Sequence, residues 1–149
     1  MKIIGFDPGF SGAWGMIEAN GAYVGCGDTI HDSKRIYTSA MYAEISQIRD
    51  KDDLAVVIEA VHAMPQQGVS STFKFGVSFG SVMALADRLN EDCHLVTPQK
   101  WKKDLGLSSD KNESLAMARE LWPEAPLKRQ KDNGRAEALL IAHWYKTQL

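Results

Sequence analysis

The sequence predicts a single α/β domain, residues 1–149, in which a five-stranded mixed sheet is flanked by helices. Short apolar runs separated by glycine-rich turns fill the first 30 residues, which predicts a three-strand antiparallel meander. Further along, short apolar runs alternate with segments of helical spacing, a pattern typical of parallel strands joined by helical crossovers. No internal repeat or linker divides the 149 residues, which suit one domain.

The meander is expected at residues 1–7, 12–19 and 22–30. The first segment, MKIIGFD, is an apolar run that ends at Pro8-Gly9. The other two segments flank Asn20-Gly21, a dipeptide that favours a tight hairpin turn. The chain is therefore expected to open with three consecutive strands.

Helices and strands alternate in the rest of the chain. Residues 54–58 (LAVVI) are continuously apolar, as expected for a central parallel strand covered on both faces, and a last short strand is expected at residues 94–96. Helices are predicted where apolar residues recur at helical spacing or where capping residues begin them. These helices are expected at residues 36–49, at residues 71–89, from Pro98, from Ser109 or Asp110 to residue 121, and at residues 134–146.

The helix predicted at residues 71–89 has one face made of small residues. Gly76, Gly80 and Ala84 recur every four positions, so their side chains share one face. Such a face permits either close packing on the sheet or contact with a second copy of the chain. The sequence leaves both interpretations open.

Composition and charge narrow the class of protein. The chain is 44% hydrophobic and 24% charged, with a net charge of −2 that does not by itself indicate a nucleic-acid partner. Lysine and arginine nevertheless cluster at residues 100–103 and 128–135, which predicts a basic groove beside acidic residues. Cys26 and Cys93 are expected to be ordinary reduced thiols of a cytoplasmic protein. Neither a signal peptide nor a membrane-spanning segment is expected, and no membrane partner is predicted.

Two carboxylates stand at the ends of predicted strands. Asp7 ends the first strand, and Glu59 comes directly after Leu-Ala-Val-Val-Ile. If these strands are parallel neighbours, both side chains emerge at the same carboxyl edge of the sheet, where open α/β sheets place their ligands. One such carboxylate can simply reach water, but two at one edge indicate a site.

The last predicted helix adds a third carboxylate. On a helical wheel Glu137 falls between Leu140 and Ile141, inside the apolar arc. An ionised glutamate on an apolar face requires a cation nearby. Asp132 stands just before this helix, where it is either a fourth acid of the site or a helix N-cap.

Together these acids predict a metal site. Asp7, Glu59, Asp132 and Glu137 would repel one another in a partly dehydrated cleft, and hard divalent cations with oxygen ligands relieve such repulsion. Mg²⁺ or Mn²⁺ suits carboxylates and water. Two such ions about 3.5–4 Å apart can activate a water and stabilise the leaving oxygen of a phosphodiester, which is the chemistry of a nuclease.

Four segments in series resemble the RuvC family of Holliday junction resolvases, most closely its branch in phages and similar genomes. The segments are IIGFDPGFSGAWG, VVIEAVHAMPQQGVSSTFKFGVSFG, VTPQKWKKDLGLSSDKNES and DNGRAEALLIAHW, in the family's order over nearly the whole chain. The resemblance implies a ribonuclease H-like fold, dependence on Mg²⁺ or Mn²⁺, and a homodimer that cuts opposed strands of four-way DNA in recombination or repair. For a phage-encoded protein, the expected compartment is the host cytoplasm.

The resemblance also implies which acids are catalytic. Asp7 and Glu59 match the family's first two carboxylates, and Glu137 matches the second carboxylate of the last motif. Gly134 occupies the position where the family usually has the first of that motif's two aspartates. Asp132, two residues earlier, is therefore the implied substitute.

Basic and polar residues are expected to contact DNA. By the resemblance, Lys102 and Lys111 lie near the scissile phosphate, and Lys111 takes part in catalysis by stabilising developing charge; both are alternatively solvated lysines on helix faces. Phe73 is suited either to wedge into an opened junction or to pack in the core. The expected DNA contacts are Gln66, Gln67, Ser70, Ser71, Phe73, Lys74, Lys100, Lys102, Lys103, Lys111 and Arg135.

Several ring side chains have two possible roles. Trp101, between two lysines, is suited either to stacking on a base or sugar or to core packing beside Leu105. His62 is a candidate for contact with DNA or water at the site. His143 is expected to be structural, and Phe75 is expected mainly in the core.

Three other functions compete with this prediction. Asp7-Pro-Gly-x-x-Gly also resembles the phosphate-binding hairpin of sugar kinases and actin-like ATPases, but those proteins need a second domain, so no nucleotide cofactor is expected. A non-catalytic protein that binds branched DNA has no need of an intact acidic site, whereas all four acids are present here. A nuclease of the same fold that acts on flaps, forks or RNA–DNA hybrids is the third alternative.

Overall fold

Five strands form one mixed sheet with the order β3-β2-β1-β4-β5 in the computed structural model, which describes residues 1–49, 53–90 and 92–149. Strands β1 (Lys2–Asp7), β2 (Ala13–Glu18) and β3 (Tyr23–Asp28) form the predicted antiparallel meander. Strand β4 (Leu54–Glu59) pairs in parallel with β1, and β5 (Cys93–Val96) pairs in parallel with β4. The predicted fold class is confirmed.

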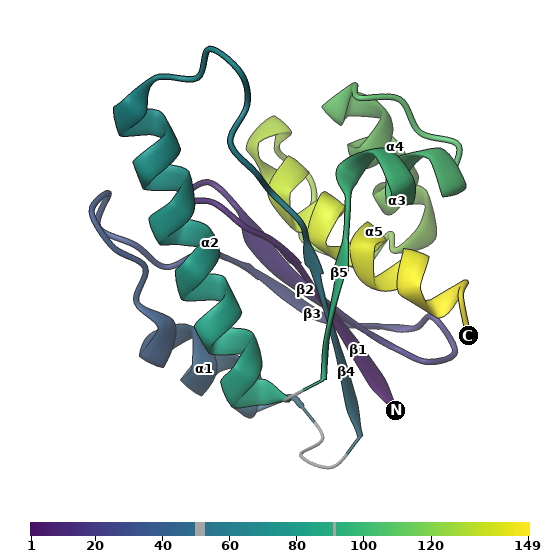
Figure 1. Ribbon diagram of the computed structural model, residues 1–149. Helices are drawn as coiled ribbons and strands as arrows, with labels where there is room; N and C mark the ends of the chain where they lie inside the picture. Colours follow the sequence, from purple (N-terminus) through teal and green to yellow (C-terminus); the bar gives the residue numbers. More distant parts are fainter. Residues whose placement is uncertain (50–52, 91) are drawn as a thin grey trace.

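Helices cover both faces of this sheet (Figure 1). Helices α1 (Thr38–Ser46) and α2 (Val69–Leu89) lie on one face. Helix α5 (Asn133–Lys146), with α3 (Pro98–Asp104) and α4 (Lys111–Leu121), lies on the other. Each of these helices was expected from the sequence, and α1 differs most because it is shorter than the expected span of residues 36–49.

The alternation of side chains along the strands determines which face each acid reaches. Ile4 packs in the cluster beside α1 and α2, whereas Ile3 packs in the cluster beside α5. Because successive side chains of a strand point to opposite faces, Asp7 lies on the same face as Ile3. In β4, Val57 packs on the α5 side, and Glu59 follows it two residues later on that face.

Helix α5 crosses the middle of the sheet at very close range. Gly5 and Gly15 lie opposite each other in the β1–β2 pair. A Cβ atom at Gly5 would lie 2.2 Å from the carbonyl oxygen of Ala138, and one at Gly15 would lie 2.7 Å from Leu139. Only glycine permits this approach, which places Glu137, the residue before Ala138, against the carboxyl edge of the sheet.

Helix α2 packs on the sheet through one face and leaves another uncovered. Its buried residues are Ser78, Val82, Leu85, Ala86 and Leu89. Cβ atoms at Gly76 and Gly80 would meet nothing within 4 Å, so close packing on the sheet does not explain these glycines. Among the described residues, α2 is the one helix that is long and apolar enough to cross a membrane, with a mean hydropathy of 1.2. Such a segment was not expected from the sequence.

Candidate functional site

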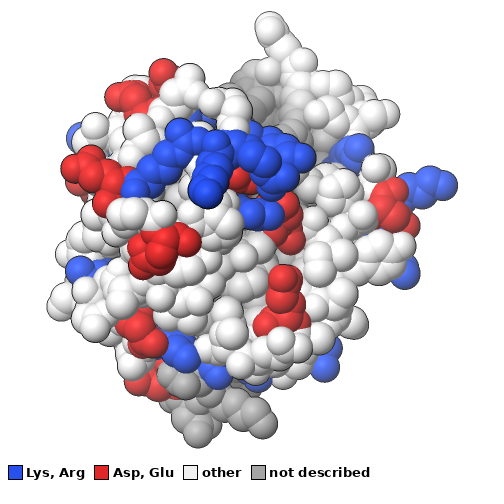
Figure 2. Space-filling view, turned by 180° about the vertical axis from the view of Figure 1, so that it is seen from behind, with Lys and Arg blue, Asp and Glu red and all other residues white. Residues whose placement is uncertain are grey.

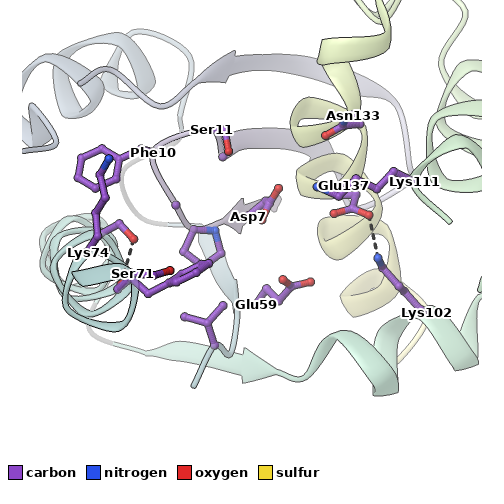
Figure 3. A pocket seen from close by; sticks show the side chains of 16 residues that line it. Asp7, Phe10, Ser11, Glu59, Ser71, Lys74, Lys102, Lys111, Asn133 and Glu137 are labelled. Carbon is purple, nitrogen blue, oxygen red and sulfur yellow. Dashed lines mark hydrogen bonds and ion pairs between the residues drawn. The ribbon is translucent and has the colours of Figure 1, made fainter. Parts of the chain in front are cut away.

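Three acids from distant parts of the chain line one cavity of about 400 Å³. Asp7 ends β1, Glu59 ends β4, and Glu137 lies in the first turns of α5 (Figure 3). Phe6 lies opposite Ile58 in the parallel β1–β4 pair, so the two acids that follow leave the sheet at the same edge. The structure thus brings together three of the four acids singled out in the sequence; their role as metal ligands stays a prediction.

Burial and mutual repulsion disfavour ionised acids in this cavity. Glu59 and Glu137 are only 9% and 5% exposed. Burial, followed by the charges of Glu59 and Glu137, raises the pKa of Asp7 well above its ordinary value, although nearby lysines oppose the shift. Burial also raises the pKa of Glu59, opposed chiefly by a hydrogen bond from Trp101. A cavity of this kind favours a bound cation.

Two lysines line the same cavity, on the side where Glu137 lies (Figure 3). Lys102 of α3 places its Nζ atom 2.8 Å from Oε1 of Glu137, so an ammonium group supplies the cation that the apolar setting of Glu137 requires. Lys111 is the first residue of α4, whose N-cap Asp110 accepts a hydrogen bond from the backbone N–H of Asn112. Both lysines line the cavity, and their contact with the scissile phosphate stays a prediction.

Asp132 lies apart from the other acids. It is 2% exposed, and its carboxylate accepts hydrogen bonds from the backbone and guanidinium of Arg129, which together cap the 3₁₀ turn η1 (Gln130–Asp132). The bond from Arg129 lowers the pKa of Asp132 below its ordinary value. The carboxylate is not among the groups that line the described cavity, so this placement favours the structural role that the sequence left open for Asp132.

Asn133 lines the cavity beside Glu137 instead. It stands four residues before Glu137 on α5, which places the two side chains on one face of the helix. Its Nδ2 donates to the backbone oxygen of Gln130 at 3.1 Å, which leaves the amide oxygen as the group that can bind a cation. Sequence reasoning missed Asn133 because it considered only acids, although the spacing of four residues from Glu137 was visible.

The first turns of α2 form another wall of the cavity. Ser71 and Lys74 line it, and the Nζ of Lys74 lies 5.0 Å from the ring centroid of Phe10. Phe73 is 74% exposed and therefore outside the core. Phe75 is 47% exposed and lines the cavity, so its expected core position is wrong.

The remaining predicted DNA contacts lie outside this cavity. Lys100 pairs with Asp104 at 2.6 Å. Arg135 binds both carboxylate oxygens of Asp28 and the carbonyl of Pro126, which makes it a brace between β3 and α5. Exposed or half-buried positions elsewhere on the surface are occupied by Gln66, Gln67, Ser70 and Lys103, the last beside a second cavity of about 530 Å³.

The ring side chains resolve into distinct roles. Trp101 is fully buried, so stacking on DNA is wrong and core packing is confirmed; its Nε1 donates to Oε2 of Glu59 at 2.7 Å. His62 is exposed and is not among the residues lining the described cavity. The ring of His143 packs edge-on against Trp122 with centroids 5.7 Å apart, as expected for a structural histidine.

A curated relative shares part of this sequence. Over 91 residues the chain is 37% identical to the chloroplastic Holliday junction resolvase MOC1 of Chlamydomonas reinhardtii. The match covers 58% of this chain and 10% of the relative, so the chain spans about a tenth of that protein's length. No family model matches the chain.

Two solved structures from Thermus thermophilus share the whole architecture. RuvC in complex with a Holliday junction substrate superposes with a TM-score of 0.62 and 18% identity, over 99% of this chain and 96% of that chain. A second RuvC structure gives a TM-score of 0.55 and 19% identity with the same coverage. The likeness to the phage branch in particular stays a prediction. The chain therefore has the RuvC fold, a ribonuclease H-like arrangement, and the resemblance to RuvC-like resolvases found in its motifs is confirmed.

Proposed function

We propose that this chain is a crossover junction endodeoxyribonuclease that resolves four-way DNA in recombination or repair by divalent-metal-dependent hydrolysis of phosphodiester bonds. The observation that carries the proposal is the meeting of Asp7, Glu59 and Glu137 in one cavity at the carboxyl edge of β1 and β4. A relative named for Holliday junction resolution and a RuvC structure with a junction substrate support the choice of four-way DNA.

The groups around the cavity suit Mg²⁺ or Mn²⁺. The three carboxylates and the amide of Asn133 are oxygen donors, and the raised pKa of Asp7 reflects a repulsion that a divalent cation relieves. Across the described part of the chain, no three His, Cys, Asp or Glu side chains lie close enough together to form an ion-binding group. Two bound ions would activate a water and stabilise the leaving oxygen of the phosphodiester.

Basic side chains have a separate task in this proposal. Lys102 and Lys111 line the cavity beside the acids, where they can bind the phosphate that flanks the cleaved bond. Lysine and arginine side chains also gather across the upper part of one face, at the end of the molecule where β1 and β4 end (Figures 1 and 2). This uneven distribution explains how a chain with a net charge of −2 can bind DNA.

We also propose that the protein works as a homodimer in the cytoplasm. Cutting two opposed strands requires two active sites, whereas one chain supplies one cavity of this composition among the described residues. The uncovered part of α2, with exposed Val69 and Phe73 and open space at Gly76 and Gly80, is a suitable surface for the second copy. Analytical ultracentrifugation of the purified protein measures the oligomeric state, and a monomer at all concentrations would contradict the proposed dimer.

Incubation with synthetic DNA tests the proposed activity. A four-way junction should receive symmetric paired nicks in Mg²⁺ or Mn²⁺ and none in chelator. Asp7→Asn should abolish cleavage while junction affinity stays within about twofold, because basic groups rather than the acids supply most of the binding free energy.

Other outcomes separate the alternative functions. Equal or faster cleavage of flaps, forks or RNA–DNA hybrids would assign a different substrate to the same chemistry. Junction binding by the wild-type protein without any metal-dependent cleavage would indicate a non-catalytic binder. Cleavage that is unchanged in Asp7→Asn would refute the assignment of the active site.

A further inference from the structure

Helix α3 begins directly beside Glu59. Val96, the last residue of β5, lies opposite Glu59 in the parallel β4–β5 pair, and its carbonyl accepts the backbone N–H of Ala60 at 2.7 Å. Thr97 then caps α3 by accepting the backbone N–H of Lys100, and Pro98 fits the first turn. The chain thus turns from strand to helix within one residue, which brings the first turn of α3 close to the end of β4.

The start of α3 at this turn places the side chain of Trp101 in contact with Glu59. Its indole Nε1 donates to Oε2 of Glu59 at 2.7 Å, and both side chains are buried. The indole ring is fixed in the core cluster that also contains Val57 and Leu115. A rigid donor on one oxygen restricts the rotation of the carboxylate and thereby limits the directions in which its other oxygen can point.

The next residue of α3 contacts a second acid. Lys102 binds Oε1 of Glu137 at 2.8 Å (Figure 3). The Nζ of Lys102 also lies 5.2 Å from the centroid of the Trp101 ring. Two consecutive side chains of one helix therefore hold acids that belong to β4 and α5. The lysine contact is one that a bound cation would replace, whereas the neutral indole N–H is compatible with a metal on the other oxygen of Glu59.

We propose that Trp101 is a positioning residue that orients Glu59 for a divalent cation through its indole N–H. The inference rests on the proposed metal-dependent function. Hydrogen-bond partners behind metal-binding side chains fix ligand orientation, and their loss typically weakens metal affinity or activity by about 10–100-fold. Trp101 is the donor in this role, and it does not itself touch DNA.

Two other buried tryptophans provide matched controls. Trp122 donates its indole N–H to the carbonyl of Gly21 at 2.9 Å, away from the cavity, and is 3% exposed. Trp14 is 2% exposed, and its indole N–H has no hydrogen-bond partner among the described residues. Phenylalanine at Trp122 thus removes volume and a hydrogen bond, and phenylalanine at Trp14 removes volume alone.

Equilibrium binding of Mn²⁺ to the DNA-free full chain tests the proposal. The free ion is counted by electron paramagnetic resonance, and melting curves verify that each variant is folded. Trp101→Phe should weaken Mn²⁺ binding about tenfold or more. Trp122→Phe and Trp14→Phe should leave the dissociation constant within about twofold of wild type even if they lower the melting temperature.

Nuclear magnetic resonance of the indole N–H groups gives a second readout that needs no Trp101 variant. Titration with Mg²⁺ and, separately, the Glu59→Gln substitution should both shift the Trp101 indole signal and leave that of Trp122 in place. If the Trp101 signal keeps its chemical shift in both experiments, the proposal is overturned. Wild-type Mn²⁺ affinity in a folded Trp101→Phe variant would overturn it as well. A wild-type chain that binds no Mn²⁺ would instead remove the proposed function and, with it, this inference.

Discussion

Asp132 and Asn133 are neighbours in the chain but point to different surroundings. The carboxylate of Asp132 turns to Arg129, whereas Asn133 lines the cavity one helical turn before Glu137. We therefore propose that Asp132 serves stability and that Asn133 takes part in cation binding. The sequence assigned the second role to Asp132 from its place just before the helix and from the resemblance of the motifs.

Substitution of Asp132 should affect stability, whereas substitution of Asn133 should affect cation binding. Asp132→Asn should lower the free energy of unfolding by about 1–2 kcal/mol, because it weakens hydrogen bonds between a buried carboxylate and a half-exposed guanidinium. Asn133→Ala should change stability by less than about 0.5 kcal/mol but weaken Mn²⁺ binding several-fold. Urea unfolding and Mn²⁺ titration measure the two effects. Loss of Mn²⁺ binding in a fully stable Asp132→Asn would restore Asp132 as a ligand.

The acids that sequence reasoning located correctly are those whose direction is fixed by regular structure. The directions of Asp7 and Glu59 follow from their places at the ends of two strands, and that of Glu137 follows from its place on an amphipathic helix. The direction of Asp132 depends on Arg129, three residues earlier at the start of the short 3₁₀ turn η1, and no periodic pattern reveals such a pairing. The Trp101 bond to Glu59 joins residues 42 positions apart, so it too required the folded structure.

At the level of elements, the contact between α5 and the sheet positions the third acid. Gly5→Ala would place a methyl group 2.2 Å from the carbonyl oxygen of Ala138, a distance far shorter than a van der Waals contact. We expect a loss of about 2 kcal/mol or more in the free energy of unfolding, because α5 must shift or the strand must bend. Chemical denaturation measures the loss.

A glycine with free space around it is the control for this substitution. At Gly68, the N-cap of α2, a Cβ would meet nothing within 4 Å, so Gly68→Ala should cost no more than about 1 kcal/mol, the penalty of alanine at a helix N-cap. Equal effects of the two substitutions would mean that α5 does not need the close approach at Gly5.

The order of the elements was predictable because hairpin turns and helical crossovers leave few topologies. Asn20-Gly21 indicated the β2–β3 hairpin, and the continuous apolar run at residues 54–58 indicated a strand covered on both faces. The packing of the glycine face of α2 was less predictable. The repeat of Gly76 and Gly80 permitted packing on the sheet, and only the folded chain shows that both glycines face open space.

Across the whole molecule, the proposed function and stability oppose each other through the acidic cavity. Burial and the charges of Glu59 and Glu137 raise the pKa of Asp7, so the folded state favours the neutral carboxyl. The corresponding stability is present below the unfolded pKa of about 3.9 and is lost as the pH rises toward the folded pKa. At pH 7 the metal-free folded state is therefore less stable than it would be with a neutral group at position 7.

Asp7→Asn removes this charge with little change in shape. The variant should melt a few degrees higher than wild type at pH 7 in chelator, since about 1 kcal/mol corresponds to roughly 2–4 °C in a domain of this size, and the gain should vanish near pH 3. Mn²⁺ should reverse the order, because a ligand bound only by the folded state stabilises the wild-type protein more. Glu120→Gln, at an exposed position on α4, should show neither effect. If metal-free Asp7→Asn were no more stable than wild type at pH 7, the acids would not repel one another as their burial requires, and the need for a cation in this cavity would lose its physical basis.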